Sequence, residues 1–251
     1  TELIDKIIGF NSHITVKPYE NKIEINEINN DLEKISKDLI LSNSGEAVIV
    51  KTDNTKGILL RGYKSKEFSK LKIFKNKEFV GENENLENNN ISLGKELSFT
   101  LNLDIGDSVT LLSSAGLDTI IGSLPKQKTF IVSSIFESGL IEFDNNIAFV
   151  NLRTLEEFLN LDKKERNLEI YLRNPQNIEY QKLIVQKNFP NDFVYSWADM
   201  NNSLFSALKV ERNVMFIILS LIIIVAAFNI ISGLTILVKN KTRDIAILKS
   251  I

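Results

Sequence analysis

The stretch from Val214 to Val238 reads VMFIILSLIIIVAAFNIISGLTILV and contains no charged residue. As a helix rising about 1.5 Å per residue it would extend roughly 37 Å, more than the roughly 30 Å hydrocarbon core of a bilayer. Buried helices of soluble proteins rarely run this long and this apolar. The stretch also lies far from the N-terminus, where a signal peptide would stand. It therefore predicts a transmembrane helix.

The charges on either side of this stretch predict its orientation. Downstream, one acid, Asp244, faces a cluster of bases: Lys239, Lys241, Arg243 and Lys249. Upstream, the bases are offset by nearby acids: Lys209 and Arg212 against Asp199 and Glu211. Since basic residues gather on the cytoplasmic side of a membrane helix, we expect a cytoplasmic C-terminus. The large portion before the helix would then lie outside the cytoplasm.

Composition excludes several classes of protein. The 251 residues carry 30 Lys plus Arg against 32 Asp plus Glu, a net charge of −2, which does not fit an electrostatic nucleic-acid binder. Hydrophobic residues make up 43%, which excludes wholesale disorder. The chain has no Cys, so disulfides, thiolate zinc sites and cysteine nucleophiles are excluded. The single histidine, His13, argues against a histidine-rich metal site, and no cofactor is expected.

Catalytic motifs are missing from the sequence. It contains no GxxxxGK[ST], GxGxxG, HExxH or GxSxG pattern. The neighbours Glu156 and Glu157 would point in different directions from a helix and are expected on a solvated face. Glu142 and Asp144 are expected at a strand entry or turn, and His13 as an ordinary strand or surface residue. We therefore expect a protein that is not an enzyme.

The portion before the membrane helix reads as an α+β domain in two parts. Two β-α-β units suggest one split subdomain of ferredoxin-like style, built from residues 12–56 and 163–198. The first unit combines two strands and a helix, at His13–Tyr19, Ala47–Lys51 and Asn26–Leu41. The second β-α-β unit has strands at Leu168–Leu172 and Phe193–Trp197 and a helix at Gln176–Lys187.

Residues 57–162 would form a mostly β insertion between these units. Apolar alternation predicts strands at Gly57–Tyr63, Asp107–Leu112, Thr129–Phe136 and Ile147–Val150. A short helix is expected at Leu152–Leu161, and a polar, solvated loop at Glu82–Asn90.

Between two of those strands lies Ser113–Lys128, with the sequence SSAGLDTIIGSLPKQK. Its apolar residues are interspersed with turn-forming residues: Leu117, Ile120, Ile121 and Leu124 with Gly116, Gly122 and Pro125. On these residues alone, an ordinary long hairpin is the favoured interpretation. The alternative is a protruding loop that offers apolar side chains to a partner.

The approach to the membrane helix also carries structural cues. Ser196-Trp197-Ala198-Asp199 fits a capping box, from which one helix would run through residues 199–213 into the span. Such a continuous helix would join the outer domain rigidly to the membrane. Within the span, Asn229, Ser232 and Gly233 would form a small, polar helix-packing face. Local bonding of Ser and Asn to the backbone is an equally good interpretation.

Both chain ends suggest a fragment. Residues 1–11 carry apolar residues at helical spacing and are expected to be the end of a preceding membrane helix. The last residues stop within an amphipathic pattern. We expect an outer domain between two membrane helices, together with the second of those helices.

The segment Val214–Ser250 resembles the second membrane helix and following segment of lipoprotein-releasing ABC-transporter permeases of the LolC/LolE type, in the MacB/FtsX-like superfamily. Similar features are VAAFNII at Val225–Ile231, a basic turn, and RDIAIL at Arg243–Leu248. Three further segments look similar to the same family: Glu2–Val16 to the exit of its first span, Gly122–Gly139 to its G-x-x-P-x-x-x-x-F hairpin, and Trp197–Phe216 to the lead into its second span.

The resemblance implies a function in the inner membrane of Gram-negative bacteria. Two permease subunits, identical or paralogous, pair with a cytoplasmic ABC ATPase dimer. ATP hydrolysis moves the periplasmic domains, which extract lipoproteins from the outer leaflet and pass them to a periplasmic chaperone. The expected contacts are thus with proteins and membrane lipid, and not with nucleic acid. The family has four membrane helices per permease, so the others are expected outside this chain.

The resemblance also assigns roles to residues. The chaperone-docking hairpin would use Gly116, Leu117, Ile120, Ile121, Gly122, Leu124, Pro125, Lys126 and Gln127. Residues 239–251 would couple to the ATPase through Lys241, Arg243, Asp244, Ile245, Ala246, Ile247 and Leu248. Helix packing or a lipoprotein cavity would involve Met215, Phe216, Leu219, Phe228, Asn229, Ser232 and Gly233.

Other interpretations stay open at this point. A MacB-type efflux permease or an FtsX-like cell-division permease would share the membrane signature but use another outer partner. A two-span sensor would read a ligand with its outer domain. A secreted hydrolase is disfavoured by the missing nucleophile motif and by the long span. The sequence does not separate a chaperone-docking subunit from a non-docking one.

Overall fold

The computed structural model describes residues 11–20, 22–23, 30–51, 54–71, 79–81, 86, 89–119 and 122–249. They belong to two units, Thr1–Met200 and Asn201–Ile251. The predicted end of a preceding membrane helix, residues 1–11, lies almost entirely outside the described residues.

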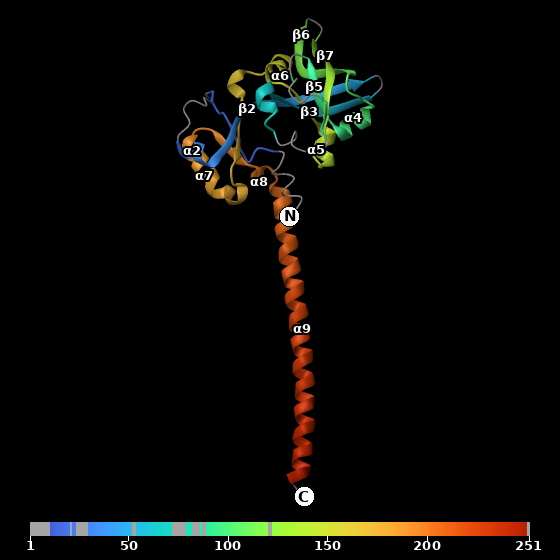
Figure 1. The fold of residues 1–251 in the computed structure, drawn as a ribbon, viewed down its shortest axis with the longest axis vertical. Helices are drawn as coiled ribbons and strands as arrows, with labels where there is room; N and C mark the ends of the chain where they lie inside the picture. Colours follow the sequence, from blue (N-terminus) through green and yellow to red (C-terminus); the bar gives the residue numbers. More distant parts are fainter. Residues whose placement is uncertain are drawn as a thin grey trace. The chain divides into compact units, whose positions relative to one another are not determined.

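Part of the first unit, called here the split lobe, comes from both ends of that unit. It comprises strands β1 (Ile14–Lys17), β9 (Asn167–Leu172), β10 (Phe193–Ser196) and the first part of β2 (Ser36–Lys51). These strands are antiparallel in the order β10-β1-β9-β2. Helices α2 (Asn30–Ile35) and α7 (Ile178–Asn188) lie together beside the sheet (Figure 1). Alternate residues of the strands pack against Leu32 of α2 and Val185 of α7 in one apolar core. The strand residues of this core include Ile14, Val16, Leu168, Ile170 and Val194.

The rest of the first unit, called here the inserted lobe, contains the second part of β2 and the elements from β3 to α6. Its strands are β3 (Asn54–Tyr63), β4 (Val80–Gly81), β5 (Asn90–Gly94), β6 (Ser108–Thr119), β7 (Gly122–Phe136) and β8 (Ile147–Asn151). Its helices are α3 (Ser65–Phe68), α4 (Lys95–Leu101), α5 (Ile141–Asn146) and α6 (Leu152–Leu159). The strand pairings close into a ring, β2-β3-β8-β5-β7-β6 and back to β2, around a second apolar core.

A single strand, β2, belongs to both lobes. Its residues up to Ser42 pair with β9, and its residues from Asn43 onward pair with β3. The helix predicted at Asn26–Leu41 is therefore wrong over its second half, because α2 ends at Ile35 and β2 begins at Ser36. The apolar spacing fits a helix, but pairing with β9 and burial against the split-lobe core favour the strand.

Other predicted elements are confirmed or corrected in detail. Six predicted strands are present: those starting at 57, 107 and 129 correspond to β3, β6 and β7, and those starting at 147, 168 and 193 correspond to β8, β9 and β10. The predicted helices starting at 152 and 176 correspond to α6 and α7. The solvated loop at Glu82–Asn90 is wrong at two described positions, since Leu86 is buried and Asn90 begins β5. Strand β5 and helix α4 were not predicted.

The second unit is one long helix, α9 (Asn202–Lys249). The predicted capping box is present: the backbone N–H and the hydroxyl of Ser196 donate to Asp199 Oδ2 at 2.7 Å, and the Asp199 N–H donates to Ser196 Oγ at 3.2 Å. The helix that it begins, α8 (Trp197–Met200), nevertheless ends before α9 starts. The prediction of one helix from Trp197 into the span is therefore wrong. Asn201 and Asn202 stand at the junction, and asparagine favours helix ends over helix interiors.

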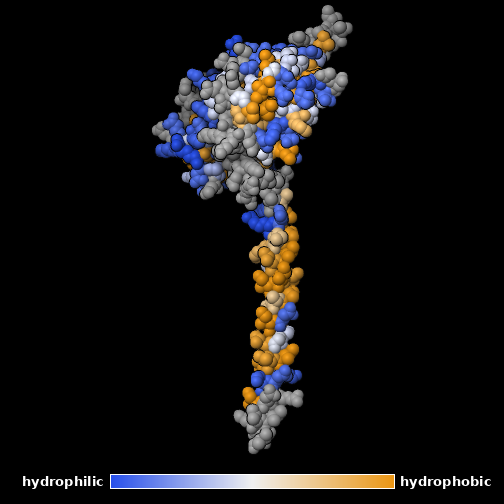
Figure 2. Space-filling model, turned by 45° about the vertical axis from the view of Figure 1, so that its right-hand side comes forward, coloured by the Kyte–Doolittle hydropathy of each residue, from blue (hydrophilic) through white to orange (hydrophobic). Residues whose placement is uncertain are grey.

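Helix α9 continues without a break through the basic residues that follow the apolar stretch. Lys239 and Lys241 therefore belong to the same helix as the apolar stretch. Figure 2 shows the apolar stretch of α9 as a mostly hydrophobic surface, with a small hydrophilic patch in its lower half and hydrophilic residues at both of its ends.

Candidate functional sites

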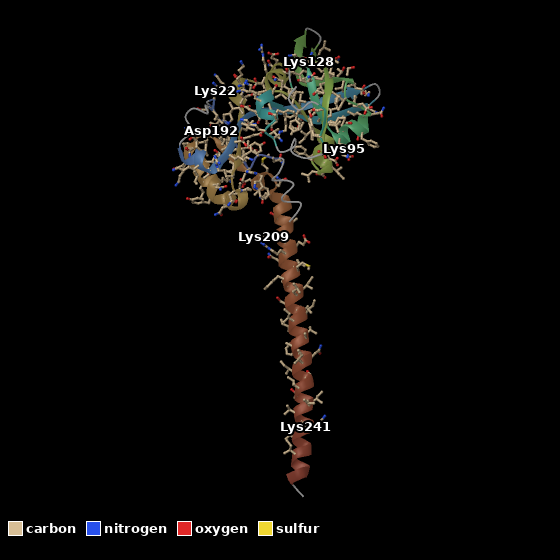
Figure 3. The ribbon with its side chains drawn as sticks, viewed as in Figure 1. Lys22, Lys95, Lys128, Asp192, Lys209 and Lys241 are labelled. Carbon is tan, nitrogen blue, oxygen red and sulfur yellow. The ribbon has the colours of Figure 1, made fainter. Side chains whose placement is uncertain are left out.

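The apolar part of α9, Lys209–Thr242, is long and hydrophobic enough to cross a membrane. Its 34 residues have a mean hydropathy of 3.0 over their most apolar window, and none of that window is buried in the protein. Figure 3 shows Lys209 and Lys241 near its two ends. The residues assigned to packing or to a lipoprotein cavity, Met215, Phe216, Leu219 and Phe228, are all exposed on this helix. An apolar surface of this size requires lipid or other membrane helices around it.

Polar side chains within this helix behave in two ways. The hydroxyls of Ser220 and Thr235 each donate to the backbone carbonyl four residues earlier, at 2.8 Å. These hydrogen bonds lie within α9 and need no second helix. Asn229, Ser232 and Gly233 stand at spacings of three and four residues and share one side of α9. The predicted contact of that side with another helix stays a prediction.

The predicted coupling residues all belong to the last turns of α9, which runs to Lys249. Among them, the structure describes the side chains of Lys241 and Ile245, and both are exposed. The remaining five, Arg243, Asp244, Ala246, Ile247 and Leu248, are placed by the backbone of the helix alone.

The predicted docking segment forms a ribbon of two strands, because β6 and β7 continue through most of it (Figure 1). Strand β6 pairs with β2 up to Ser113, and beyond that residue it pairs with β7 alone. The described ribbon residues beyond Ser113, 114–119 and 122–125, therefore lie past the ring of strand pairings. Ile120 and Ile121 lie outside the described residues, and of Leu117 only the backbone is described.

An irregularity in the ribbon explains the position of Pro125. Ser113 pairs with Lys126 and Leu117 pairs with Leu124, so residues 114–116 stand opposite Pro125 alone. Proline lacks the N–H that a regular strand pairing needs, and a bulge is where a strand tolerates it. Pro125 thus marks the point where the ribbon changes register, and Gly116 lies on the bulged strand.

The predicted docking residues differ in exposure. Leu124 is 57% exposed, and Pro125 and Gln127 are also exposed. The Lys126 ammonium donates to the backbone carbonyl of Glu157, which holds the base of the ribbon against α6. Lys128, labelled in Figure 3, stands 5.6 Å from the centre of the Phe130 ring. Lys126 therefore has a structural contact, whereas Leu124 is available to a partner.

Sequence reasoning missed a buried carboxylate between the two lobes. Glu169 on β9 accepts hydrogen bonds from Ser42 Oγ at 2.6 Å, Arg61 Nη2 at 2.9 Å and Tyr171 OH at 3.1 Å. Tyr63 OH lies 2.9 and 3.0 Å from its two oxygens. The Arg61 guanidinium also stands 5.5 Å from the centre of the Tyr63 ring. The sequence offered one indication of this ion pair: a single charged residue stands inside each of two apolar strand segments, Glu169 in LEIYL and Arg61 in GILLRGY.

The electrostatics of this cluster keep its donors protonated. Burial is the largest cause that raises the pKa of Tyr63 well above its usual value. The charge of Arg61 lowers this pKa, and the charge of Glu169 raises it further. Burial and the charge of Glu169 do the same to the pKa of Tyr171. Burial opposes the charge on Arg61, but its neighbours outweigh burial and raise its pKa. Both phenols therefore donate to a carboxylate that faces a permanent cation.

Two other carboxylates differ from their predicted environments. Glu156 is buried and accepts from Arg166 Nε and Nη2 at 2.6 and 2.7 Å, so the expected solvated face is wrong for it. Its neighbour Glu157 is exposed, as predicted, and pairs with Arg153 at 2.8 Å. Glu142 and Asp144 both lie within α5, so the expected strand entry or turn is wrong for both. Asp144 is buried and accepts from the Ser138 N–H at 2.9 and 3.1 Å.

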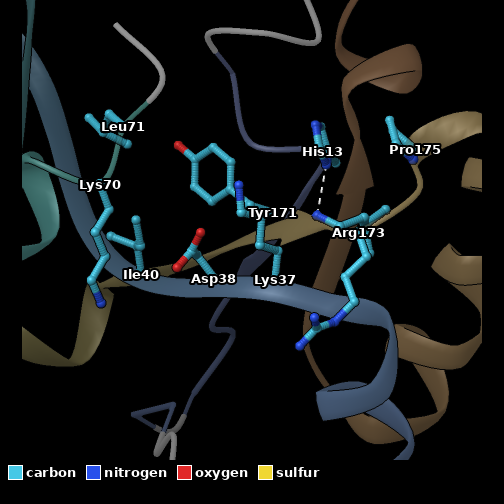
Figure 4. A pocket seen from close by; sticks show the side chains of 10 residues that line it. His13, Lys37, Asp38, Ile40, Lys70, Leu71, Tyr171, Arg173 and Pro175 are labelled. Carbon is cyan, nitrogen blue, oxygen red and sulfur yellow. Dashed lines mark hydrogen bonds between the residues drawn. The ribbon is translucent and has the colours of Figure 1, made fainter. Parts of the chain in front are cut away.

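His13 directly precedes β1 and is buried, so the expected strand or surface position is wrong for it. Its Nδ1 accepts from the Leu172 N–H at 2.7 Å. Figure 4 shows it beside a cavity of about 220 Å³, which is lined by both lobes: His13, Lys37, Asp38, Ile40, Lys70, Leu71, Tyr171, Leu172, Arg173 and Pro175. The histidine thus has a structural role in joining its segment to β9. Across the described part of the chain, no group of three or more His, Cys, Asp or Glu residues could hold a metal ion.

Comparison with known proteins confirms the family resemblance. The chain is 36% identical over 196 residues to the lipoprotein-releasing system transmembrane protein LolC of Xylella fastidiosa strain Temecula1, covering 77% of this chain and 47% of that protein. It is 33% identical over 212 residues to LolC of Neisseria meningitidis serogroup B, covering 83% of this chain and 51% of that protein. This chain is a homologue of LolC. It spans about half the length of these relatives.

The homologue of LolC has weaker likenesses among solved structures. The periplasmic region of MacB from Actinobacillus actinomycetemcomitans gives a TM-score of 0.45 at 10% identity, covering 81% of this chain and 98% of that one. The extracellular domain of the ABC-type transporter YknZ gives 0.43 at 11% identity, covering 72% and 100%. No protein-family model matches the sequence.

Proposed function

We propose that this chain is part of a permease subunit in an ATP-driven complex that releases lipoproteins from the outer leaflet of the inner membrane. The observation that carries the proposal is the identity of 33–36% to LolC proteins over most of the chain. The exposed apolar helix supports it, because extraction from a membrane requires an anchor in that membrane. Hydrolysis would take place on a cytoplasmic ABC ATPase dimer.

The complex would contain a second permease subunit, identical or paralogous. A LolE protein of Haemophilus influenzae is 27% identical to this chain over 161 residues, which supports a paralogous pair. The side of α9 that carries Asn229, Ser232 and Gly233 is the proposed contact between membrane helices. The denser basic cluster after the apolar stretch supports a periplasmic outer domain and a cytoplasmic C-terminus.

The ribbon of β6 and β7 is the proposed dock for a periplasmic lipoprotein chaperone. It extends past its ring of strands and exposes Leu124 near its end. A lipoprotein chaperone must present an apolar cavity, and apolar side chains on a narrow ribbon suit contact with such a surface. The last turns of α9, from Lys241 to Leu248, would meet the ATPase as part of one continuous helix.

The strand order of the split lobe supports the proposal of a ferredoxin-like fold. The antiparallel order β10-β1-β9-β2, with α2 after β1 and α7 after β9, agrees with a split β-α-β-β-α-β unit. We propose that the inserted lobe faces the chaperone. The split lobe is the part whose last strand, β10, comes shortly before the membrane helix in the sequence.

Chaperone binding by the full-length permease in its complex tests this function. Leu124→Asp should weaken binding of the lipoprotein chaperone about 10-fold or more, since a charge would be buried in an apolar contact. Leu183→Asp on α7 is the matched control, because Leu183 is 58% exposed against 57% for Leu124. Equal binding by both variants would contradict docking on the ribbon. Binding of an efflux adaptor in place of the chaperone would favour a MacB-type permease.

A further inference from the structure

The chain passes between the two lobes at a narrow neck. It leaves the split lobe between Ser42 and Asn43 on β2, and it returns at Asn167, where β9 begins. Ser42 pairs with Asn167, so the two crossings lie side by side. Two paired strands form a ribbon that twists and bends more readily than a wide sheet. Ile40 and Tyr171, on the split-lobe strands, also pack in the apolar core of the inserted lobe. Apart from this packing and the polar contacts below, the neck would act as a hinge between the lobes.

A buried ion pair closes across this neck. Glu169 lies two residues into β9 from the neck and belongs to the split lobe, whereas Arg61 and Tyr63 belong to β3 of the inserted lobe. Their contacts with the Glu169 carboxylate are 2.9 to 3.0 Å long. Ser42, on the other crossing strand, donates to the same carboxylate. One carboxylate therefore bonds both crossing strands and the neighbouring lobe.

A second ion pair fixes the returning strand to the inserted lobe. Arg166 directly precedes β9, and it donates two hydrogen bonds, at 2.6 and 2.7 Å, to Glu156 on α6. Both partners are largely withdrawn from solvent. Two parallel N–H to oxygen bonds fix orientation as well as distance. The strand that leaves the inserted lobe is thereby held against α6.

The two pairs lie on opposite faces of β3. A Cβ atom at Gly62 would contact Leu155 at 3.0 Å and the Leu152 backbone at 3.1 Å, so α6 covers the face to which position 62 points. Arg61 is adjacent in the strand and points to the other face. Glu156 on α6 and Glu169 beyond Arg61 thus brace the neck from two sides. Bending toward either face would stretch one of the pairs.

We propose that Glu169, with Arg61 and Tyr63, and Glu156, with Arg166, form a two-sided lock that makes the lobes move as one rigid lever. Glu169 is the central positioning residue, because donors from Ser42, Arg61, Tyr63 and Tyr171 converge on it. Removing its charge would leave a buried guanidinium without its counterion. The lock stands on the geometry alone, and its use in transmitting force from the ATPase rests on the proposed function.

The distance between the lobes in the full-length complex tests the lock. The 251 residues contain no Cys, so once any Cys elsewhere in the complex is replaced, spin labels can be placed at Phe99 on α4 and Leu183 on α7 after mutation to Cys. Both positions are exposed. Pulsed electron-spin measurements should give one narrow distance distribution for the unmodified lock. Glu169→Gln and Arg166→Gln should each broaden it about twofold, as expected for a released hinge.

Arg153→Gln is the matched control, because it breaks the exposed pair with Glu157 on α6 and leaves both lock pairs intact. It should not change the distribution. Should Glu169→Gln fail to assemble, Tyr63→Phe removes one donor across the neck and should still broaden the distribution. A broad distribution in the unmodified lock, or an unchanged width in the lock variants, would overturn the proposal. Lipoprotein release, measured separately, can fail while the distances behave as predicted, so the two proposals are distinguishable.

Discussion

Gly94 approaches the backbone of Asp144 so closely that a Cβ atom at position 94 would stand 2.0 Å from the Asp144 carbonyl oxygen. The backbone of Gly94 has φ −68° and ψ 147°, a conformation open to any residue. The glycine is therefore required by space, where β5 gives way to α4 and α5 packs against it, and not by a special backbone angle.

This contact predicts that Gly94→Ala destabilises the inserted lobe by about 3 kcal/mol, because the obstacle is backbone and cannot rotate away. Gly57→Ala is the matched control: it is also in a strand, but a Cβ there would meet no atom within 4 Å. Denaturant unfolding should leave Gly57→Ala within about 0.5 kcal/mol of the unmodified chain. Similar losses in both variants would contradict the close approach.

The tyrosines around Glu169 predict a loss of stability at alkaline pH. Their pKa values are raised in the folded protein, so the stability they contribute is complete below their unfolded pKa, near 10, and is lost as pH rises above it. Thermal unfolding between pH 8 and 11 should show this decline. In the double variant Tyr63→Phe and Tyr171→Phe the decline should be smaller. An equal slope in both proteins would rule out raised pKa values at these two phenols.

Asp199 predicts the opposite dependence in acid. Burial opposes its charge, but hydrogen bonds from Lys182 and Ser196 outweigh burial and hold its pKa below the usual value. Its contribution is therefore present above the unfolded pKa, near 4, and is lost as pH falls. At pH 7, Asp199→Ala should cost about 1 kcal/mol through loss of the cap, and the cost should shrink by pH 3. A cost independent of pH would show that packing, not charge, is responsible.

The last turns of α9 predict a separation of coupling from folding. Leu248→Asp should abolish the stimulation of ATPase activity in the assembled complex, because a charge would enter an apolar partner groove. Asn240→Asp adds the same charge earlier on α9 and should retain stimulation. The outer domain should unfold at the same temperature in both variants. Retained stimulation in Leu248→Asp would count against this segment as the coupling contact.

The membrane helix and most strands could be predicted because each rests on a local pattern. The apolar run from Val214 to Val238 needs no tertiary information, and LEIYL around Ile170 reads as a strand by residue type alone. The strand at Ser36–Leu41 could not be predicted, because its helical spacing is overridden by pairing with β9. Local patterns failed where a distant partner decided the structure.

The lock residues were missed for the same reason. Glu169 and Arg61 are 108 positions apart, and neither stands in a motif. Only the strand pairing brings β3, β2 and β9 together at the neck. Glu156 was expected in solvent because its partner, Arg166, follows α6 in a segment that carries no pattern. The ribbon, in contrast, was located by its Gly and Pro residues, although its strands extend further than the apolar alternation indicated.

Release of a lipoprotein from vesicles is the most direct test of the central claim. The full-length permease, its partner permease and the ATPase would be reconstituted with a triacylated lipoprotein, and transfer to the soluble chaperone would be measured with and without ATP. We predict ATP-dependent transfer that Leu124→Asp reduces and Leu183→Asp does not. An active ATPase with no transfer of lipoprotein in the unmodified complex would contradict the account.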